Sequence, residues 1–391
     1  MSRIDELIQE LCPDGVRFLT IGEAATVTAG ATPSKSVASY WTNGTIPWLS
    51  SGEVNKGTIH EADTLITQEG YDSCSTRMVP AGAVVIALAG QGKTRGMVAR
   101  TRLECCTNQS LASVVPDSDE LDSDFLFYFL RTQYARLRDV SSGDGTRGGL
   151  NLSMIRAYRI PVPPLEVQRE IVRVLDKFTQ LEAELEAELE ARRVQYEHYR
   201  RELLSGGEGA SGRIIPLGEI FEMRAGTHIK AAEISDEPTE EKPYPCYGGN
   251  GLRGYVSSYN YDESVIFVGR QGALCGNVHR AEGKIYATEH AVVVTPKVAV
   301  DMSWAFHKLT EMDLNQYKTK SAQPGLAVGR VKQVEAQYVP IVDQRRHGEV
   351  LDKLDTLVSD ISIGLPAELG ARREQYEHYR DRLLTFKELT S

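Results

Sequence analysis

The longest periodic stretch of the chain lies at residues 165–204. Apolar residues recur there at steps of three and four: Ile171, Leu175, Phe178, Leu181, Leu185 and Leu189. That spacing places them on one face of a helix. Pro163 and Pro164 precede the stretch, and Ser205-Gly206-Gly207 follows it, as expected at helix ends. The pattern predicts one helix of about 60 Å.

A second helical pattern covers residues 341–387. Its apolar seam is predicted to contain Val350, Leu354, Leu357, Val358 and Ile361. Because glutamates flank the seam of the first helix, that seam is narrow and needs a partner, and the second helix is the natural one. Gly364-Leu365-Pro366 interrupts the second pattern, so we expect a kink or a fresh start there.

The segments around these helices, 18–160 and 213–338, have mixed character. Short apolar runs bounded by Gly and Pro predict buried strands at 84–89, 112–115, 264–268 and 291–294. Amphipathic patterns predict short helices at 125–138 and 304–316.

The chain contains an internal repeat. Residues 191–204 read ARRVQYEHYRRELL and residues 371–384 read ARREQYEHYRDRLL, with eleven of the fourteen positions identical. A Pro-x-x-x-Gln pattern precedes each helix, at Pro164 and Gln168 and again at Pro340 and Gln344. The globular segments between are not alike in detail. The repeated helix ends indicate two similar surfaces. The different globular segments indicate that the two halves perform related but different functions.

Composition narrows the class of protein. The length of 391 residues suggests two or three domains. The apolar share of 41% and mean hydropathy of −0.30 are typical of a soluble protein, and no apolar run reaches the ~18 residues of a membrane span. The first residues show no signal-peptide pattern, and the six cysteines form no CxxC pair or zinc spacing. We therefore expect a cytoplasmic protein with reduced thiols.

The net charge of −10 argues against a protein that binds nucleic acid by charge alone. Two stretches nevertheless carry basic residues without any acidic one, from Arg77 to Arg102 and from Leu314 to Val334. Asn and Gln side chains accompany both, and these residue types contact phosphates and base edges. The alternative for each residue is an ordinary solvated loop.

No catalytic pattern is complete. Gly90–Thr94 resembles a phosphate-binding loop, but the first glycine of that motif is replaced by Ala87, and a turn and a strand are predicted to follow rather than a helix. Methyltransferase and dinucleotide signatures are missing, and the histidines are scattered. We predict neither a catalytic site nor a metal site.

With this organisation the chain resembles the specificity subunits of type I restriction–modification enzymes. The resemblance rests on segments in a characteristic order: 11–16 (LCPDGV), 29–34 (AGATPS), 44–52 (GTIPWLSSG), 160–168 (IPVPPLEVQ), the LEAE tandem, 247–251 (YGGNG) and 269–272 (GRQG). The second spacer departs from the family at Gly364 and Pro366.

The resemblance implies an α+β fold. Two mixed α/β target-recognition domains would stand in a pseudo-two-fold arrangement, separated by two long antiparallel helices that form a coiled coil. The boundaries we predict are 1–162 for the first target-recognition domain, 163–206 for the central spacer helix, 207–338 for the second target-recognition domain and 339–391 for the distal spacer helix.

The function implied is sequence-specific recognition of double-stranded DNA, with each domain reading one half of a bipartite asymmetric site. Such a chain is a non-catalytic subunit of a DNA adenine methyltransferase and type I endodeoxyribonuclease complex. Two copies of a modification subunit would be its partners, and restriction subunits would join them for cleavage. S-adenosylmethionine, and ATP with Mg²⁺ for restriction, would bind to those partners, and this chain would bind no cofactor and no membrane.

The sequence suggests candidate residues for contacts with DNA and with the partner subunits. For DNA contacts we predict Gln91, Lys93, Thr94, Arg95, Asn108 and Gln109 in the first half and Asn250, Arg253, Arg270, Gln271, His290, Lys318, Lys320 and Gln323 in the second. For partner contacts we predict Gln195, Tyr196, His198, Tyr199 and Arg200 and, in the second repeat, Gln375, Tyr376, His378, Tyr379 and Arg380.

Two other classes of protein remain as alternatives. One is a coiled-coil interaction scaffold that does not read bases. The other is a self-sufficient ATPase or methyltransferase, which the missing motifs argue against.

Overall fold

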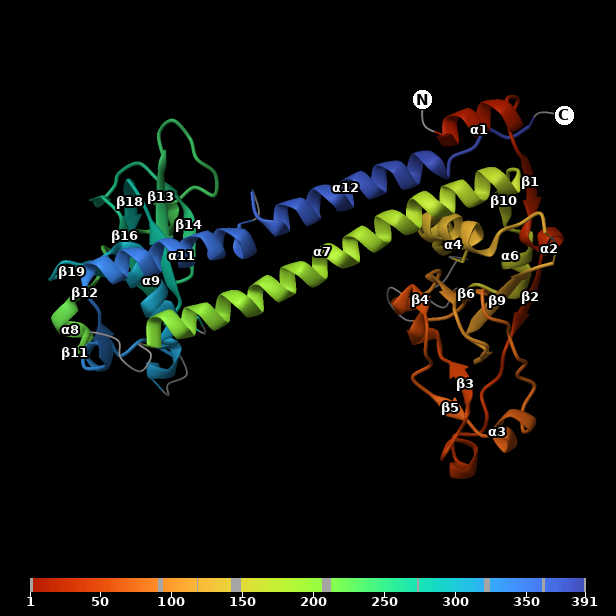
Figure 1. Ribbon diagram of the computed structural model, residues 1–391, viewed down its shortest axis with the longest axis horizontal. Helices are drawn as coiled ribbons and strands as arrows, with labels where there is room; N and C mark the ends of the chain where they lie inside the picture. Colours follow the sequence, from red (N-terminus) through yellow and green to blue (C-terminus); the bar gives the residue numbers. More distant parts are fainter. Residues whose placement is uncertain are drawn as a thin grey trace. The chain divides into compact units, whose positions relative to one another are not determined.

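The computed structural model of the chain describes residues 3–90, 94–117, 119–141, 149–205, 212–272, 274–319, 324–360 and 363–389. The chain divides into two compact units, each formed by residues distant in sequence (Figure 1). Unit 1 contains Met1–Ala183 and Ala371–Ser391, and unit 2 contains Glu184–Gly370.

Unit 1 is built on a five-stranded sheet in the order β2-β9-β6-β7-β4, in which only β4 pairs in parallel. The strands are β2 (Ala25–Ala29), β9 (Leu111–Pro116), β6 (Val84–Ala87), β7 (Val98–Thr101) and β4 (Thr58–Ile59). A smaller sheet contains β5 (Leu65–Ile66), β3 (Ile46–Leu49) and β8 (Cys106–Thr107), and β1 (Arg17–Thr20) pairs with β10 (Arg159–Val162). The helices are α1 (Arg3–Leu11), α2 (Ile21–Ala24), α3 (Gln68–Asp72), α4 (Ser123–Thr132), α5 (Tyr134–Val140) and α6 (Leu152–Ala157), with 3-10 turns η1 (Ala38–Tyr40) and η2 (Ser51–Lys56).

Unit 2 repeats this plan. Its main sheet has the order β12-β19-β16-β17, formed by β12 (Phe221–Ala225), β19 (Ala291–Pro296), β16 (Val265–Gly269) and β17 (Val278–Ala281). A second sheet contains β14 (Gly251–Val256), β13 (Tyr244–Gly248), β18 (Lys284–Ala287) and β15 (Tyr261–Asp262), and β11 (Arg213–Pro216) pairs with β20 (Glu335–Tyr338). The helices are α8 (Leu217–Ile220), α9 (Met302–Glu311), α10 (Val328–Val331) and α11 (Ile341–Ser359), with 3-10 turns η3 (Ala231–Glu233) and η4 (Leu314–Tyr317).

The two units therefore share one order of elements. A strand, a short helix and a sheet strand open each unit, at β1-α2-β2 and β11-α8-β12. A strand paired with the first one then closes it, at β10 and β20, directly before a long helix. The prediction of two repeated, mixed α/β domains with a long helix between them is confirmed.

The predicted central helix is α7 (Leu165–Ser205), which is continuous over 41 residues. The second helical segment is not continuous, as the glycine and proline predicted: α11 ends at Ser359 and α12 (Leu365–Leu383) begins six residues later. A Cβ on Gly364 would lie 2.5 Å from the carbonyl oxygen of Thr356, so there is no room for a side chain at this position between the two helices.

One detail of the predicted seam is wrong. Val350 is 41% exposed, whereas its neighbour Leu351 is fully buried in the core of unit 2. Leu354, Leu357 and Val358 do pack into that core, and Ile361 lies outside the described residues.

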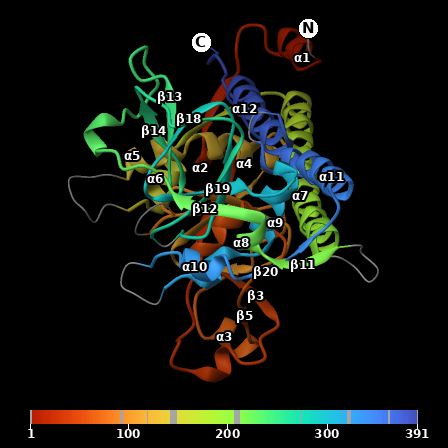
Figure 2. The ribbon, with the colours of Figure 1, turned by 90° about the vertical axis from the view of Figure 1, so that its left-hand side faces the viewer.

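Within unit 1, α7 and α12 pack antiparallel. The Phe178 ring lies 5.7 Å from the Tyr379 ring and 6.2 Å from the Tyr376 ring, centroid to centroid. Four residues later on α7, Glu182 forms an ion pair of 2.6 Å with Arg373. The partner numbers fall as those of α7 rise, which defines the antiparallel direction. In unit 2, α9 lies between the main sheet and the helices α7 and α11 (Figure 2).

The Pro-x-x-x-Gln pattern has a structural role in both units. In unit 1 the buried Gln168 amide donates to the carbonyl oxygens of Pro163 (2.6 Å) and Glu120 (2.7 Å) and accepts from the Asp122 backbone N–H (2.8 Å). Asp122 is the N-cap of α4. The glutamine thus joins the start of the long helix to the start of α4.

The same connection exists in unit 2. Gln344 donates to the Val339 carbonyl (2.7 Å) and accepts from the backbone N–H of Asp301 (2.9 Å), which is the N-cap of α9. This shared pattern therefore orients each long helix on its own domain.

Candidate nucleic-acid interface

A turn after β8 lies at the centre of the candidate site of unit 1. The Asn108 backbone N–H donates to the Leu49 carbonyl (3.0 Å), and the Asn108 side-chain oxygen accepts from the Ser110 N–H (3.0 Å). Gly30 approaches so closely that a Cβ there would lie 1.7 Å from the Thr107 carbonyl oxygen. The turn is therefore held by its own Asn108 side chain and by two neighbouring segments.

Unit 2 builds the same turn after β18. The Thr288 N–H donates to the Tyr247 carbonyl (2.9 Å), and the Thr288 hydroxyl accepts from the His290 N–H (3.4 Å). A Cβ on Gly226 would lie 2.3 Å from the Ala287 carbonyl oxygen. Thr288 thus occupies the position of Asn108, so that residues 108–110 correspond to residues 288–290.

Two further segments join each turn. In unit 1 the Leu88 N–H donates to the Ser110 carbonyl (2.9 Å), and the Leu150 N–H donates to the Leu88 carbonyl (3.0 Å). In unit 2 the Arg270 N–H donates to the His290 carbonyl and the Leu326 N–H to the Arg270 carbonyl, both at 2.8 Å. Loops far apart in the sequence thus meet at one edge of each unit, which we call the loop edge.

The predicted residues of the first half that are described lie at this edge. Thr94 and Arg95 are half-buried in the turn that leads into β7, which is a strand as predicted. Asn108 is half-buried and holds the turn, while Gln109 is exposed. Gln91 and Lys93 lie outside the described residues.

Most of the predicted residues of the second half also come together. The Arg270 guanidinium donates to the Glu289 carbonyl (3.3 Å), and the Gln271 side-chain oxygen lies 3.0 Å from His290 Nδ1. The β13–β14 hairpin reaches the same place, because a Cβ on Gly249 would lie 2.8 Å from the His290 carbonyl oxygen. Asn250 is exposed in this hairpin.

The remaining predicted residues of this half are more peripheral. Arg253 is exposed on β14, and Lys318 is exposed and contacts the Asn315 side chain (2.9 Å). The backbone of Lys318 forms a bridge with Leu326, at the loop edge. Lys320 and Gln323 lie outside the described residues.

Three residues at the loop edges, Thr32, His228 and Glu289, were not among those predicted from the sequence. The Thr32 hydroxyl donates to Gln109 Oε1 (2.6 Å) in unit 1, and His228 Nδ1 lies 2.8 Å from Glu289 Oε1 in unit 2. Burial by itself would raise the pKa of Glu289, but hydrogen bonds from its own backbone N–H and from His228 lower it. A signal existed: Thr32 and His228 each stand two residues after a matching Ala-Gly pair.

The interpretation of residues 77–102 as one basic patch is wrong for Arg100 and Arg102. Arg100 is buried and binds Asp124 (3.1 Å) and Asp176 (2.9 Å), and Arg102 binds Asp124 (2.9 Å). The strand β7 directs these side chains toward α4 and α7, whose acidic residues are distant in sequence.

The second stretch has the same error at Lys332, which binds Glu222 at 3.0 Å. Hydrogen bonds from Lys332 and then Lys297 lower the pKa of Glu222 to about 2. The net charge of a sequence window therefore overstated the free positive charge in both units.

The predicted partner residues divide into two groups. Tyr196 is buried against His307 of unit 2, and Tyr376 is half-buried against Phe178 of unit 1. The outward-facing side chains are those of His198, Tyr199, Gln375, His378 and Tyr379, whereas Gln195, Arg200 and Arg380 are half-buried.

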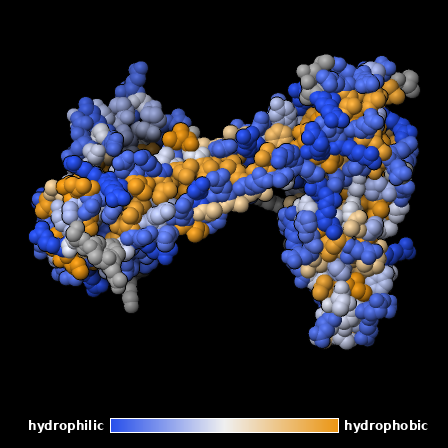
Figure 3. Space-filling view, in the orientation of Figure 1, coloured by the Kyte–Doolittle hydropathy of each residue, from blue (hydrophilic) through white to orange (hydrophobic). Residues whose placement is uncertain are grey.

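Figure 3 shows hydrophobic residues along the helices. On α7, Val194 is 62% exposed and Leu181 is 37% exposed.

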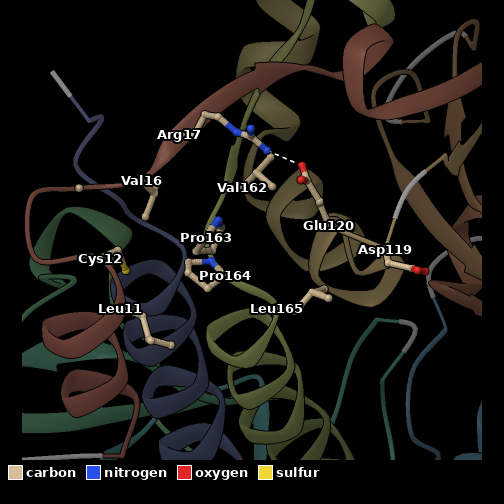
Figure 4. A pocket seen from close by; sticks show the side chains of 11 residues that line it. Leu11, Cys12, Val16, Arg17, Asp119, Glu120, Val162, Pro163, Pro164 and Leu165 are labelled. Carbon is tan, nitrogen blue, oxygen red and sulfur yellow. Dashed lines mark hydrogen bonds and ion pairs between the residues drawn. The ribbon is translucent and has the colours of Figure 1, made fainter. Parts of the chain in front are cut away.

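A separate cavity of about 440 Å³ lies in unit 1, where α7 begins (Figure 4). Its wall includes Cys12, Val162, Pro164 and an ion pair between Arg17 and Glu120. It is lined by none of the loop-edge residues, so it is distinct from the candidate interface.

In the part of the chain that the structure describes, no cluster of His, Cys, Asp or Glu side chains is arranged to hold a metal ion. The six cysteines are all free thiols. Among these same residues, no helix is both long enough and apolar enough to cross a membrane.

Comparisons with known proteins agree with this architecture. The family described as "Type I restriction modification DNA specificity domain" matches residues 13–191 and again 213–371. The chain is 38% identical over 380 residues to the type I restriction enzyme EcoprrI specificity subunit of Escherichia coli, and the alignment covers 93% of each chain. It is 30% identical over 303 residues to a putative type I specificity subunit of Haemophilus influenzae, covering 70% of this chain and 74% of the other.

Solved structures share the fold. The S subunit of a type I restriction–modification system from M. genitalium has a TM-score of 0.63 at 18% identity, covering 95% of this chain and 96% of the other. The HsdS subunit from Thermoanaerobacter tengcongensis has a TM-score of 0.53 at 15% identity, covering 96% and 97%.

Two repeated domains, each with a loop edge and a long helix, define a bipartite recognition protein. The double family match and the relative that covers nearly its full length show that the chain belongs to the type I restriction–modification DNA specificity subunits. It is accordingly a non-catalytic subunit that recognises DNA sequence, and a scaffold that does not read bases is not favoured.

Proposed function

We propose that the loop edge of each unit reads one half of a bipartite, asymmetric site in double-stranded DNA. The observation that carries this proposal is the pair of equivalent turns, 108–110 and 288–290, which share their backbone hydrogen bonds and differ in their side chains. Bases are read by side chains presented on a rigid scaffold. Equal scaffolds with unequal side chains suit the reading of two different half-sites.

In unit 1 the reading groups are those around the turn. The Gln109 amide is exposed, with Asn108 beneath it and Thr94 and Arg95 in the adjoining loop. Gln91 and Lys93 belong to the same loop in sequence, and we retain them as proposed contacts. Amides read base edges, and the basic residues neutralise phosphates.

In unit 2 the equivalent groups are Arg270, Gln271 and His290, with Asn250 from the adjoining hairpin. Arg253 and Lys318 flank them as phosphate contacts, and Lys320 and Gln323 follow in the same sequence segment. The proposed surface is richer in charged groups than that of unit 1.

The partners we propose are DNA, two copies of a modification subunit and, for cleavage, restriction subunits. Support comes from the repeated helix ends, where His198 and Tyr199 and again His378 and Tyr379 face outward. Two like surfaces suit two copies of one partner. S-adenosylmethionine and ATP would then bind to the partners and none to this chain, and a DNA ligand together with free thiols favours a cytoplasmic location.

Methylation mapping tests the proposal. Genomic DNA from cells that contain the modification subunit is compared with and without this chain. We expect a split, asymmetric methylated motif that depends on the chain. Methylation without sequence preference, or a gel shift that enriches no sequence from random duplexes in the presence of the modification subunit, would contradict it.

A further inference from the structure

The two loop edges contain a matching pair of side chains that contact each other. In unit 1 the pair is Thr32 and Gln109, with 2.6 Å between Thr32 Oγ1 and Gln109 Oε1. In unit 2 it is His228 and Glu289, with 2.8 Å between His228 Nδ1 and Glu289 Oε1. Each pair joins the segment after the first sheet strand, β2 or β12, to the turn after β8 or β18.

The backbone shows that the pairs are equivalent. Gly30 and Gly226, each two residues before the first member, touch the carbonyl of the residue that precedes the turn. The second member follows Asn108 in one unit and Thr288 in the other, the side chains that accept the turn hydrogen bond. The contact has therefore been kept at these two positions while both residue types changed.

The chemistry presented differs between the units. An amide oxygen has two lone pairs, so Gln109 Oε1 can accept from Thr32 and from a base while its NH₂ donates. An amide oriented in this way matches the N6 and N7 atoms of adenine. The Thr32 hydroxyl holds the amide plane in place.

In unit 2 the carboxylate is the inner member of the pair. The Glu289 side chain is only 25% exposed, whereas the His228 side chain is 73% exposed. Glu289 Oε1 also lies 3.4 Å from His290 Nε2, so one carboxylate orients two imidazole rings. The outer atoms here belong to a ring, which cannot form the bidentate amide contact with adenine.

We propose that positions 32 and 109, and their counterparts 228 and 289, are specificity-determining positions for the two half-sites. Gln109 reads an adenine and Thr32 positions its amide. His228 reads the corresponding base pair of the other half-site, and Glu289 positions the ring. This inference rests on the proposed function and names the residues that set the difference between the half-sites.

The test uses the full chain with its modification subunit and reads the methylated motif from genomic DNA. The double variant Thr32→His with Gln109→Glu transplants the pair of unit 2 into unit 1. Its expected effect is loss of the adenine preference at one position of one half-site, roughly 5- to 150-fold in relative methylation, the range for one bidentate contact. The other half of the motif should be unchanged.

The reciprocal variant, His228→Thr with Glu289→Gln, should change one position of the other half-site only. Positioning by Thr32 is tested by two single variants. Thr32→Ser keeps the hydroxyl and should retain the wild-type motif, whereas Thr32→Val should relax the same base position that Gln109→Ala relaxes.

A matched control is available on the strand that precedes Thr32. Thr26 on β2 donates to Asp117 at 2.6 Å, an exposed hydrogen bond of the same kind. Thr26→Val should leave the motif unchanged. Thermal unfolding of each variant, measured beside the wild type, separates a change in reading from a failure to fold.

The outcomes distinguish the two proposals. A sequence-specific motif that survives both double variants unaltered would refute the assignment of these positions and leave the proposed function standing. Methylation without any sequence preference in the wild type would refute the proposed function itself.

Discussion

Each unit joins its sheet to its long helix through an arginine–aspartate contact, and the two contacts differ in the groups that surround the ion pair. In unit 1, Arg100 on β7 binds Asp176 on α7 at 2.9 Å, and the Tyr128 hydroxyl on α4 donates to the same carboxylate at 2.6 Å. The guanidinium lies 4.9 Å from the centre of the Phe127 ring.

In unit 2, Arg280 on β17 binds Asp352 on α11 at 2.6 Å and lies 4.6 Å from the centre of the Phe306 ring. The third group is His307, whose Nε2 lies 2.9 Å from Asp352 and whose Nδ1 lies 3.2 Å from the Tyr196 hydroxyl. A histidine thus replaces the tyrosine.

The difference has two consequences. The Arg100 side chain is 9% exposed and meets two carboxylates, whereas the Arg280 side chain is 37% exposed and meets one, so the arginine of unit 1 is the more deeply buried. The contact of unit 2 contains an imidazole, the side chain whose ordinary pKa lies near neutrality. The equivalent contacts therefore contain a more deeply buried arginine in unit 1 and a titratable histidine in unit 2.

The largest effect is expected from removing the arginines. Arg100→Ala leaves Asp124 and Asp176 without their shared cation and opens a cavity, and should lower the free energy of unfolding by about 3–5 kcal/mol. Arg280→Ala should lower it by about 1.5–3 kcal/mol, because solvent reaches the site. Denaturant unfolding measures both losses of unfolding free energy. Equal losses would show that the two arginines stabilise their units to the same extent.

The next-largest loss of stability is expected from replacing the buried glutamines. Gln168→Ala orphans three backbone groups in unit 1, and Gln344→Ala orphans two in unit 2. An orphaned buried group costs about 1–3 kcal/mol when water cannot replace its partner, so the unit 1 variant should be the less stable. The midpoints of urea unfolding decide the order, and Gln→Glu variants control for side-chain volume.

A pH dependence is expected in unit 2. Burial lowers the pKa of His307 below its ordinary value of 6.5, so the folded state keeps this ring neutral while the unfolded chain takes up a proton. The stability gained from His307 is therefore complete above pH 6.5 and is lost as the pH falls toward the folded-state pKa. His307→Tyr should reduce the loss of stability between pH 7.5 and pH 5.5.

The reciprocal substitution sharpens this test. Tyr128→His should add the same acid sensitivity to unit 1. His279 and His347, whose pKa values burial also lowers, are unchanged in both variants and contribute a common background. Identical pH profiles for wild type and His307→Tyr would show that His307 does not titrate differently on folding.

The smallest effect on stability is expected at the repeated tyrosines. Tyr199→Ala should change the free energy of unfolding by no more than about 0.5 kcal/mol, because the side chain faces outward. Tyr379→Ala should cost about 0.5–1.5 kcal/mol, because that ring also stacks on Phe178. Both should weaken capture of the modification subunit, measured by titration calorimetry, and retained binding by the double variant would exclude this surface.

The sequence alone determined the architecture. The periodicity of residues 165–204, the nearly identical helix ends and the break at Gly364 gave two repeated domains, a continuous helix and an interrupted one. These are local or repeated patterns, because helix periodicity and a helix-breaking glycine and proline act over a few residues.

Only the tertiary structure decided which side chains are available to DNA. Arg100 and Arg102 looked like free cations in the sequence, but they bind acidic residues up to 76 positions away. Glu289 carried no signal of its own in the sequence, because its partner His228 is 61 residues distant. The physical reason is that ion pairs and hydrogen bonds form between segments that only folding brings together. Helix periodicity, in contrast, depends on residues within one segment.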